Sequence, residues 1–315
     1  MSAINMPSPL TLITDHPGHS RGISLYMKRD DLLHPVVQGN KWRKMEPAIK
    51  AIANKQFEGI ITFGGPFSNH LHAVASAGRH FGFPTAAIIR GTAVDTTNPT
   101  LSFAQQCGME LIPVLKKDYD AALSSPTVQH ILNAYQHYLH LPEGGTGTSA
   151  VRNCVGIAKE ILEQTTGVAA ENRFVAIPAG TGSTAAGLIE GMGTLGKTLV
   201  FPAAPYGVDE HRIQQYILDA FGHSGPPFEV VSDYTFGKFA VFDPELMRFV
   251  QEFRHTTEIQ LDPIYTSKMM WGLYDLLKQG FFPDMAVIVA VHTGGLQGWE
   301  GFKERFGVQI DPYST

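Results

Sequence analysis

The sequence lacks several features that mark particular classes of protein. Its 315 residues include two cysteines, Cys107 and Cys154, too few for a disulfide scaffold or a four-cysteine zinc site. Acidic residues outnumber basic ones by 29 to 24, so no basic surplus points to nucleic acid or to an anionic membrane as a partner. We therefore expect a protein of a reducing, cytoplasmic compartment that binds neither.

Targeting segments and long apolar runs are also missing. The start, Met1–Pro7, has no cationic residues followed by an apolar stretch, so we expect no signal peptide. The apolar run Met285–Val291 is far shorter than the roughly 18 residues that a membrane helix needs. Hydrophobic residues still make up 43% of the chain, enough for a sizeable core, and the length fits about two domains.

Two kinds of segment alternate along the chain. Short apolar runs read as buried strands: Gly59–Phe63, Ala86–Arg90, Phe174–Pro178, Leu199–Pro202 and Met285–Val291. Stretches with helical periodicity lie between and after them: Val128–His140, Val151–Gln164 and Pro244–Arg254. Continuous apolar strands that alternate with helices predict open, parallel sheets covered on both faces. The glycine-rich stretch Leu141–Ser149, near the midpoint, is the expected crossing between domains.

One local pattern occurs three times. A strand ends, glycines and a hydroxyl residue follow, and a helix begins, at Thr62–Asn69, Pro178–Thr184 and Val291–Leu296. Ligands of open α/β sheets bind beyond the carboxyl ends of the strands. Glycine allows close approach of the backbone, and a helix N-terminus offers free N–H groups and partial positive charge. We therefore expect the three loops to form the walls of one site for an anionic ligand.

The segment Gly180–Gly187, Gly-Thr-Gly-Ser-Thr-Ala-Ala-Gly, suits a phosphate group best. Its small residues and hydroxyls leave backbone donors accessible. It is not a Walker A loop, because no Gly-Lys-Ser/Thr follows, and Ser183 lacks the flanking glycines of a nucleophile elbow. It matches a dinucleotide fingerprint only loosely, which leaves a nucleotide-dependent oxidoreductase as an alternative.

The segment Gln38–Lys44 carries the most reactive candidate side chain, Lys41. Asn40 is a good N-cap, which would place Lys41 in the first turn of a helix. The helix N-terminus and the cations of Arg43 and Lys44 would all lower the pKa of Lys41, as a Schiff-base lysine requires. The alternative is a solvated, basic helix start.

Two further segments offer polar groups at expected helix starts. Ser68 can cap a helix or relay a proton, and Asn69 can bond a ligand oxygen. His70 and His72 are two residues apart and do not share a helix face, so we expect no metal site from this pair. Tyr265 stands just before an expected helix and is either a ligand contact or a packing residue.

Together these segments resemble one family, the 1-aminocyclopropane-1-carboxylate deaminases and D-cysteine desulfhydrases, which use pyridoxal 5'-phosphate. The resemblance runs from Lys28–Asp31 to Gly298. It rests on five motifs in the family's order: Gly-Asn-Lys-x-Arg-Lys, Gly-Gly-x-x-Ser-Asn-His, Gly-Thr-Gly-Ser-Thr-x-x-Gly, Leu-Asp-Pro-x-Tyr-Thr-x-Lys and His-Thr-Gly-Gly.

The resemblance implies the tryptophan synthase β type of fold (fold type II of the pyridoxal-phosphate enzymes). Two three-layer α/β domains with open, mostly parallel sheets are expected, usually in a homodimer. Residues 1–45 and 152–315 would form the larger, cofactor-binding domain, and residues 46–151 the smaller, inserted domain.

Roles for individual residues also follow from the resemblance. Lys41 would bear the cofactor and act in catalysis with Ser68 and Tyr265. Asn69 would bond the pyridoxal 3-oxygen, and Thr266 would face the pyridine nitrogen. The phosphate would be held by Gly180, Thr181, Gly182, Ser183 and Thr184. A small amino-acid substrate would meet Ser68, Asn69, His70, Tyr265 and Thr293.

The branch of the family is indicated by single positions. Thr266 stands where deaminases carry glutamate, and Thr293 where they tend to carry leucine and desulfhydrases threonine. The resemblance therefore implies α,β-elimination from D-cysteine, giving pyruvate, ammonia and hydrogen sulfide. Two departures bear on the substrate: Phe239 takes the place of a second family tyrosine, and Gly145–Ser149 differs from the usual Gly-Gly-Ser-Asn. A phenyl ring cannot exchange a proton.

Two other functions remain open from the sequence. One is a 1-aminocyclopropane-1-carboxylate deaminase, or another amino-acid lyase or racemase. The other is a non-catalytic protein that keeps the fold and binds a phosphorylated ligand.

Overall fold

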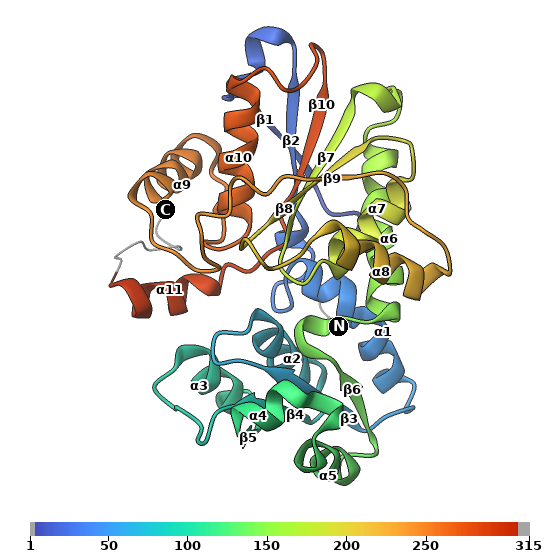
Figure 1. Ribbon diagram of the computed structural model, residues 1–315, viewed down its shortest axis with the longest axis vertical. Coiled ribbons are helices and arrows are strands. Elements are labelled where there is room, and N and C mark those ends of the chain that lie inside the picture. Colours follow the sequence, from blue (N-terminus) through green and yellow to red (C-terminus); the bar gives the residue numbers. More distant parts are fainter. Residues whose placement is uncertain (1–3, 308–315) are drawn as a thin grey trace.

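Two β-sheets organise the computed structural model, which describes residues 4–307. The larger sheet has six strands in the order β1-β2-β10-β7-β8-β9, and the smaller has four in the order β5-β4-β3-β6. The larger sheet uses β1 (Leu10–Ile13), β2 (Ser24–Lys28), β7 (Arg173–Ala179), β8 (Lys197–Pro202), β9 (Glu229–Val230) and β10 (Val287–Val291). The smaller uses β3 (Gly59–Gly64), β4 (Thr85–Arg90), β5 (Glu110–Val114) and β6 (Tyr138–Leu141). The two sheets lie one above the other in Figure 1.

The larger sheet is covered by helices on both faces. Its strands pair in parallel except for β1, which runs antiparallel to β2. Alternate residues of β7 enter opposite cores: Phe174 and Ala176 pack under α9 (Pro244–Thr257) and α10 (Thr266–Lys278). Val175 and Ile177 pack against the helices of the other face. Those helices are α6 (Thr148–Gln164), α7 (Ser183–Met192) and α8 (Glu210–Phe221). The two-residue period of a strand thus feeds two separate apolar layers.

The smaller sheet repeats this arrangement with all strands parallel. Ile60, Ala87 and Ile89 face one core, and Ile61 and Ile88 face the other. The first core is closed by α1 (Asn40–Ala53), α2 (Asn69–Phe81) and α3 (Pro99–Gln106), and the second by α4 (Lys116–Ala121) and α5 (Pro126–Ala134). Short 3-10 turns and the C-terminal helix α11 (Gly298–Phe306) complete the described chain. The predicted fold class, α/β with open and mostly parallel sheets, is confirmed.

One predicted helix is wrong at its C-terminal end. The pattern Val128–His140 indicates a single helix, but α5 ends at Ala134 and Tyr138–Leu141 form strand β6. Tyr138 and Leu139 are half-buried, and the strand pairs with β3 at the edge of the sheet. An edge strand with only partial burial has little apolar signal, which explains the error.

Helix α1 connects the two halves of the molecule. The expected domain boundary at residues 45 and 46 falls inside it, and the boundary at 151 and 152 falls inside α6. Trp42 and Met45 pack into the core of the smaller sheet. On its other side, Arg43 donates to Asp30 at 2.8 and 3.0 Å and to Glu160 of α6 at 2.6 and 3.0 Å. The helix is therefore fixed to both halves.

Within residues 4–307, no helix combines the length and apolarity needed to cross a membrane.

Candidate active site

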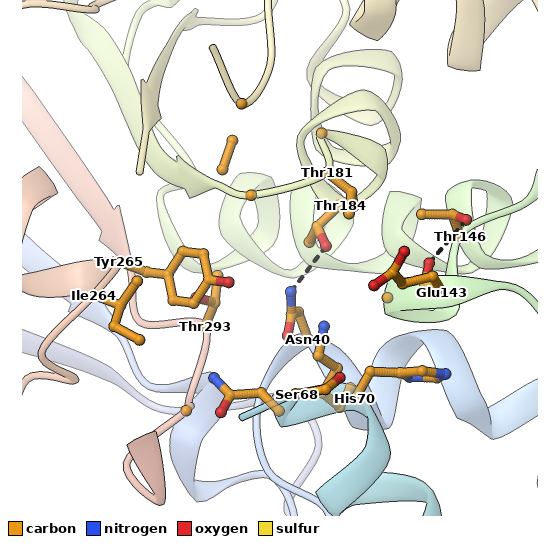
Figure 2. Close-up of a pocket in the computed structure, with 18 of the residues that line it drawn as sticks. Asn40, Ser68, His70, Glu143, Thr146, Thr181, Thr184, Ile264, Tyr265 and Thr293 are labelled. Carbon is orange, nitrogen blue, oxygen red and sulfur yellow. Dashed lines mark hydrogen bonds between the residues drawn. The ribbon is translucent and has the colours of Figure 1, made fainter. Parts of the chain in front are cut away.

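A cavity of about 620 Å³ lies between the two sheets. The three glycine-containing loops predicted from the sequence all line it, through Gly65–Asn69, Ala179–Gly182 and Thr293–Gly295. They follow β3, β7 and β10, so the cavity opens at the carboxyl ends of parallel strands. Figure 2 shows Thr181 and Thr184 above the cavity, Ser68 and His70 below it, and Tyr265 and Thr293 to one side.

The start of helix α7 offers free backbone donors to the cavity. Gly182 precedes the helix with φ 93°, a conformation that suits glycine, and a Cβ there would lie 2.6 Å from Val208 Cγ2. The first intrahelical bond runs from Ala186 N to Gly182 O, so the preceding N–H groups have no partner within the helix. Thr184 Oγ1 accepts from Asn40 Nδ2 at 3.0 Å (Figure 2). This end of the cavity therefore offers backbone donors that can bind an anion such as a phosphate.

Lys41 reaches the cavity from the first turn of α1. The prediction of Asn40 as the N-cap is wrong. Asn40 is the first residue of the helix, and the N-cap is Gly39, with φ 63°. A Cβ on Gly39 would lie 1.9 Å from Thr293 O. Asn40 N donates to that same oxygen at 3.1 Å. Close contact with the third loop therefore requires glycine before Lys41 and fixes where the helix begins.

The environment of Lys41 favours a neutral amine. Burial lowers the pKa of Lys41 well below its usual value, and the cation of Lys44 lowers it further. Lys44 is itself buried, its Nζ donates to Gly144 O at 3.2 Å, and burial lowers its pKa to about 8. Arg43, which the sequence suggested as a further source of like charge, instead pairs with Asp30 and Glu160.

Helix α2 presents polar groups from the smaller half. Ser68 is its N-cap, and its Oγ accepts from Leu71 N at 3.2 Å. The hydroxyl proton of Ser68 is thus left for a ligand. Asn69 Nδ2 approaches the third loop, because a Cβ on Gly295 would lie 3.1 Å from it. Both residues line the cavity.

His70 lines the cavity as a neutral acceptor. Thr62 Oγ1 donates to Leu141 O at 2.9 Å, so its contact of 2.8 Å with His70 Nε2 needs a proton on that nitrogen. Nδ1 then carries a free lone pair, is buried and has no partner. Burial lowers the pKa of His70 well below its usual value, and Lys41 and Lys44 lower it further.

The loop before α10 places Tyr265 beside Gly180, at the end of the cavity where α7 begins. A Cβ on Gly180 would lie 3.3 Å from Tyr265 Oη, and the ring meets Phe239 edge-on at 5.3 Å between centroids. Burial raises the pKa of Tyr265, and the charge of Asp262 raises it further, so the phenol keeps its proton. Tyr265, Phe239 and Thr293 all line the cavity.

Two predicted site residues do not line the cavity. Thr266 is fully buried, donates its hydroxyl to Asp262 and receives a bond from Asp262 N at 2.9 Å. Ser183 is fully buried, with its Oγ 3.3 Å from Thr181 Oγ1. Neither is among the residues that line the cavity. Ser183 can still offer its backbone N–H, whereas the hydroxyl of Thr266 stabilises the loop that carries Tyr265.

Several lining residues were missed by the sequence analysis. Lys44 was considered only for its charge and was not predicted to line the cavity. The others are Arg90, Glu143, Arg212 and Tyr216. Lys44 could have been found, because positions three apart share a helix face and Lys41 was already a candidate. Arg90 and Arg212 follow no motif and reach the cavity only through the fold.

The cavity fits pyridoxal phosphate on its own chemistry. An amine with a lowered pKa, Lys41, can bond an aldehyde. The α7 start and the cation of Lys44 can hold a phosphate. The described residues include no group of three or more side chains that could hold a metal ion.

Comparisons with known proteins agree with this chemistry. The D-cysteine desulfhydrase of Salmonella paratyphi A is 26% identical over 312 residues, covering 94% of this chain and 93% of that protein. The bifunctional D-cysteine desulfhydrase/1-aminocyclopropane-1-carboxylate deaminase of Arabidopsis thaliana is 26% identical over 314 residues, covering 94% and 78%. A crystal structure of an ACC deaminase homologue shares the fold, with a TM-score of 0.76, 23% identity and coverage of 94% and 91%.

A family model described as pyridoxal-phosphate dependent enzyme matches residues 5–294, which is most of the chain. The predicted cofactor and the expected fold type are thereby confirmed. The chain belongs to the family of pyridoxal-phosphate dependent enzymes.

Proposed function

We propose that this enzyme is a lyase that eliminates hydrogen sulfide from D-cysteine, giving pyruvate and ammonia after addition of water. The observation that carries the proposal is the position of Lys41, whose amine shares one cavity with the start of α7 and with Tyr265. The similarity to D-cysteine desulfhydrases over most of the chain supports the same reaction. Thr293, the position that favours the desulfhydrase branch, lines the cavity.

We assign the cofactor contacts as follows. Lys41 would bond the aldehyde, and Asn69 would bond the 3-oxygen of the ring. The loop of Gly180, Thr181, Gly182, Ser183 and Thr184 holds the phosphate, largely through backbone N–H groups at the α7 start. Lys44 adds a buried positive charge. When bound, pyridoxal phosphate supplies an electron-withdrawing ring that stabilises negative charge at the substrate Cα.

The chain's own residues then bind the substrate and move its protons. The start of α2 at Ser68 and Asn69 binds the α-carboxylate through free N–H groups and the Ser68 hydroxyl. Once the substrate amine has displaced it, Lys41 Nζ takes the proton from Cα, helped by burial that lowers the pKa of Lys41 well below its usual value. Tyr265 Oη, which keeps its proton, gives it to the departing sulfur.

His70 has a different part in this scheme. With its proton fixed on Nε2 by Thr62, its Nδ1 accepts a hydrogen bond from the bound ligand and does not act as an acid.

The test is an assay of purified enzyme with D-cysteine, L-cysteine and 1-aminocyclopropane-1-carboxylate, measuring sulfide, ammonia, pyruvate and 2-oxobutyrate. We expect sulfide and pyruvate in equal amounts from D-cysteine. The Lys41→Ala variant should lose both turnover and the visible absorption band of the lysine-bound cofactor. Formation of 2-oxobutyrate from the cyclopropane acid without sulfide from D-cysteine would favour the deaminase instead.

We also propose a cytoplasmic homodimer. Both cysteines are free thiols in the structure, as a reducing compartment would keep them. Light scattering after size-exclusion chromatography should give about twice the 34.4 kDa of one chain. A mass of 34.4 kDa would contradict the dimer.

A further inference from the structure

The mouth of the cavity carries an arginine that the proposed reaction does not use. Arg90 is the last residue of β4, is exposed, and lines the cavity. A Cβ on Gly65 would lie 3.9 Å from Arg90 Nη2. The guanidinium therefore stands beside the first glycine loop, on the side of the cavity where the substrate is proposed to bind.

An aromatic ring, and not a carboxylate, supports this guanidinium. Arg90 Cζ lies 6.0 Å from the centroid of the Tyr119 ring. Tyr119 is buried and donates its hydroxyl to Glu143 Oε1 at 2.9 Å, which fixes the ring. Over residues 4–307, Arg90 makes no ion pair. Its charge and its forked donors are thus left for a ligand.

The balance of charge in the cavity leaves Arg90 without an obvious use. Among the described residues, four lysine and arginine side chains line the cavity, Lys41, Lys44, Arg90 and Arg212, against one carboxylate, Glu143. In the proposed function, Lys41 bonds the cofactor and Lys44 meets its phosphate. The α-carboxylate is taken by the start of α2. Arginine stays charged at every physiological pH, and its planar fork matches a carboxylate or another oxyanion.

We propose that Arg90 selects substrates that carry a second anionic group on the side chain. The preferred substrates would be amino acids whose side chain ends in a carboxylate, sulfonate or phosphate. This inference rests on one part of the proposed function, namely that the substrate is an amino acid. It extends the substrate class beyond D-cysteine, whose side chain has no such group.

The test measures binding by isothermal titration calorimetry on the cofactor-loaded enzyme. The probes are aspartate and glutamate, each against its amide, asparagine and glutamine, in both configurations. Each pair matches in size and differs in side-chain charge. We expect the wild type to bind at least one acid roughly tenfold or more tightly than its amide, as one charge-assisted pair of hydrogen bonds would give. In Arg90→Met the preference should fall to about one.

Three variants make the result specific. Arg248→Met removes an exposed arginine on α9 that does not line the cavity, and should keep the wild-type preference. Arg90→Lys keeps the charge without the fork, and should give an intermediate preference. If Arg90→Met fails to fold, the Arg90→Lys variant serves as the test in its place. Arg212→Met should keep a preference for the acid, because Arg212 lies on α8 in the other half.

Several outcomes would overturn the proposal. They are equal binding of acid and amide by the wild type, a preference that survives in Arg90→Met, and a preference lost in Arg212→Met alone. Equal weakening of acid and amide in Arg90→Met would place Arg90 at the α-carboxylate and would also overturn it. Absence of sulfide from D-cysteine would refute only the proposed elimination, because calorimetry needs no turnover.

Discussion

Replacing Glu160 by glutamine should destabilise the enzyme strongly, because its carboxylate neutralises two buried cations. Its oxygens accept from Lys28 Nζ at 2.6 Å, Arg43 Nη1 at 2.6 Å and Ser8 N at 3.0 Å. Lys28 is 0% exposed and Arg43 2%. Glutamine keeps the shape but removes the charge and turns one acceptor into a donor. Breaking a buried ion pair on one side costs about 3–5 kcal/mol.

The loss should appear as a decrease in Tm of roughly 5–8 °C at pH 7. The matched control is Glu163→Gln, on the same helix but exposed, which should change stability by less than about 0.5 kcal/mol. Equal Tm values for the two variants would refute the argument that Glu160 neutralises the cluster.

Acid should weaken the same cluster in the wild type. Burial by itself would raise the pKa of Glu160, but hydrogen bonds from Arg43 and Lys28 outweigh it and lower the pKa to about 2. The folded-state pKa thus lies below the unfolded value, so this stabilisation is complete above about pH 4.5 and is lost as the pH falls toward 2. The Tm difference between wild type and Glu160→Gln should therefore shrink over that range. A difference independent of pH would contradict the assignment.

Three other changes test the site. Gly39→Ala would place a methyl group 1.9 Å from Thr293 O, at a φ of 63°. We therefore expect the affinity for the cofactor, measured by fluorescence titration, to fall at least tenfold. An affinity within twofold of the wild type would contradict the close contact. Burial lowers the pKa of Lys44 to about 8, so affinity for pyridoxal phosphate should fall above that pH in the wild type. In Lys44→Met the affinity should not change over the same pH range. Parallel pH curves for the two proteins would show that Lys44 does not contact the phosphate. Thr62→Val deletes the acceptor for His70 Nε2. The free energy of unfolding, measured by urea titration, should fall by about 1–3 kcal/mol. An unchanged urea midpoint would refute the hydrogen bond that fixes the tautomer of His70.

The buried strands and the glycine loops were accessible from the sequence. Runs such as Phe174–Pro178 are apolar without interruption, which a strand covered on both faces requires. The hydroxyl and glycine residues that follow them mark turns into helices, and parallel strands bring such turns to one edge. The site's outline therefore follows from local patterns together with one topological rule.

Other parts of the site depend on contacts that no local pattern encodes. Arg90 ends a strand like any surface arginine, and only the fold places it beside Gly65. Thr266 has the residue type of a ligand contact, but Asp262 captures its hydroxyl. Strands β1 and β6 are short and partly exposed, so their apolar signal is weak. In each case, long-range packing decides the outcome.

The reactive amine is carried by an element that belongs to neither half alone. Because α1 is packed into the smaller sheet's core and ion-paired to α6, a change in the angle between the halves would tilt the helix and displace Lys41 relative to the α7 start. The distance between Lys41 Nζ and the α7 start therefore depends on the angle between the two halves. In the binding mode proposed above, pyridoxal phosphate contacts both Lys41 and the α7 start, and it would therefore fix the angle between the two halves.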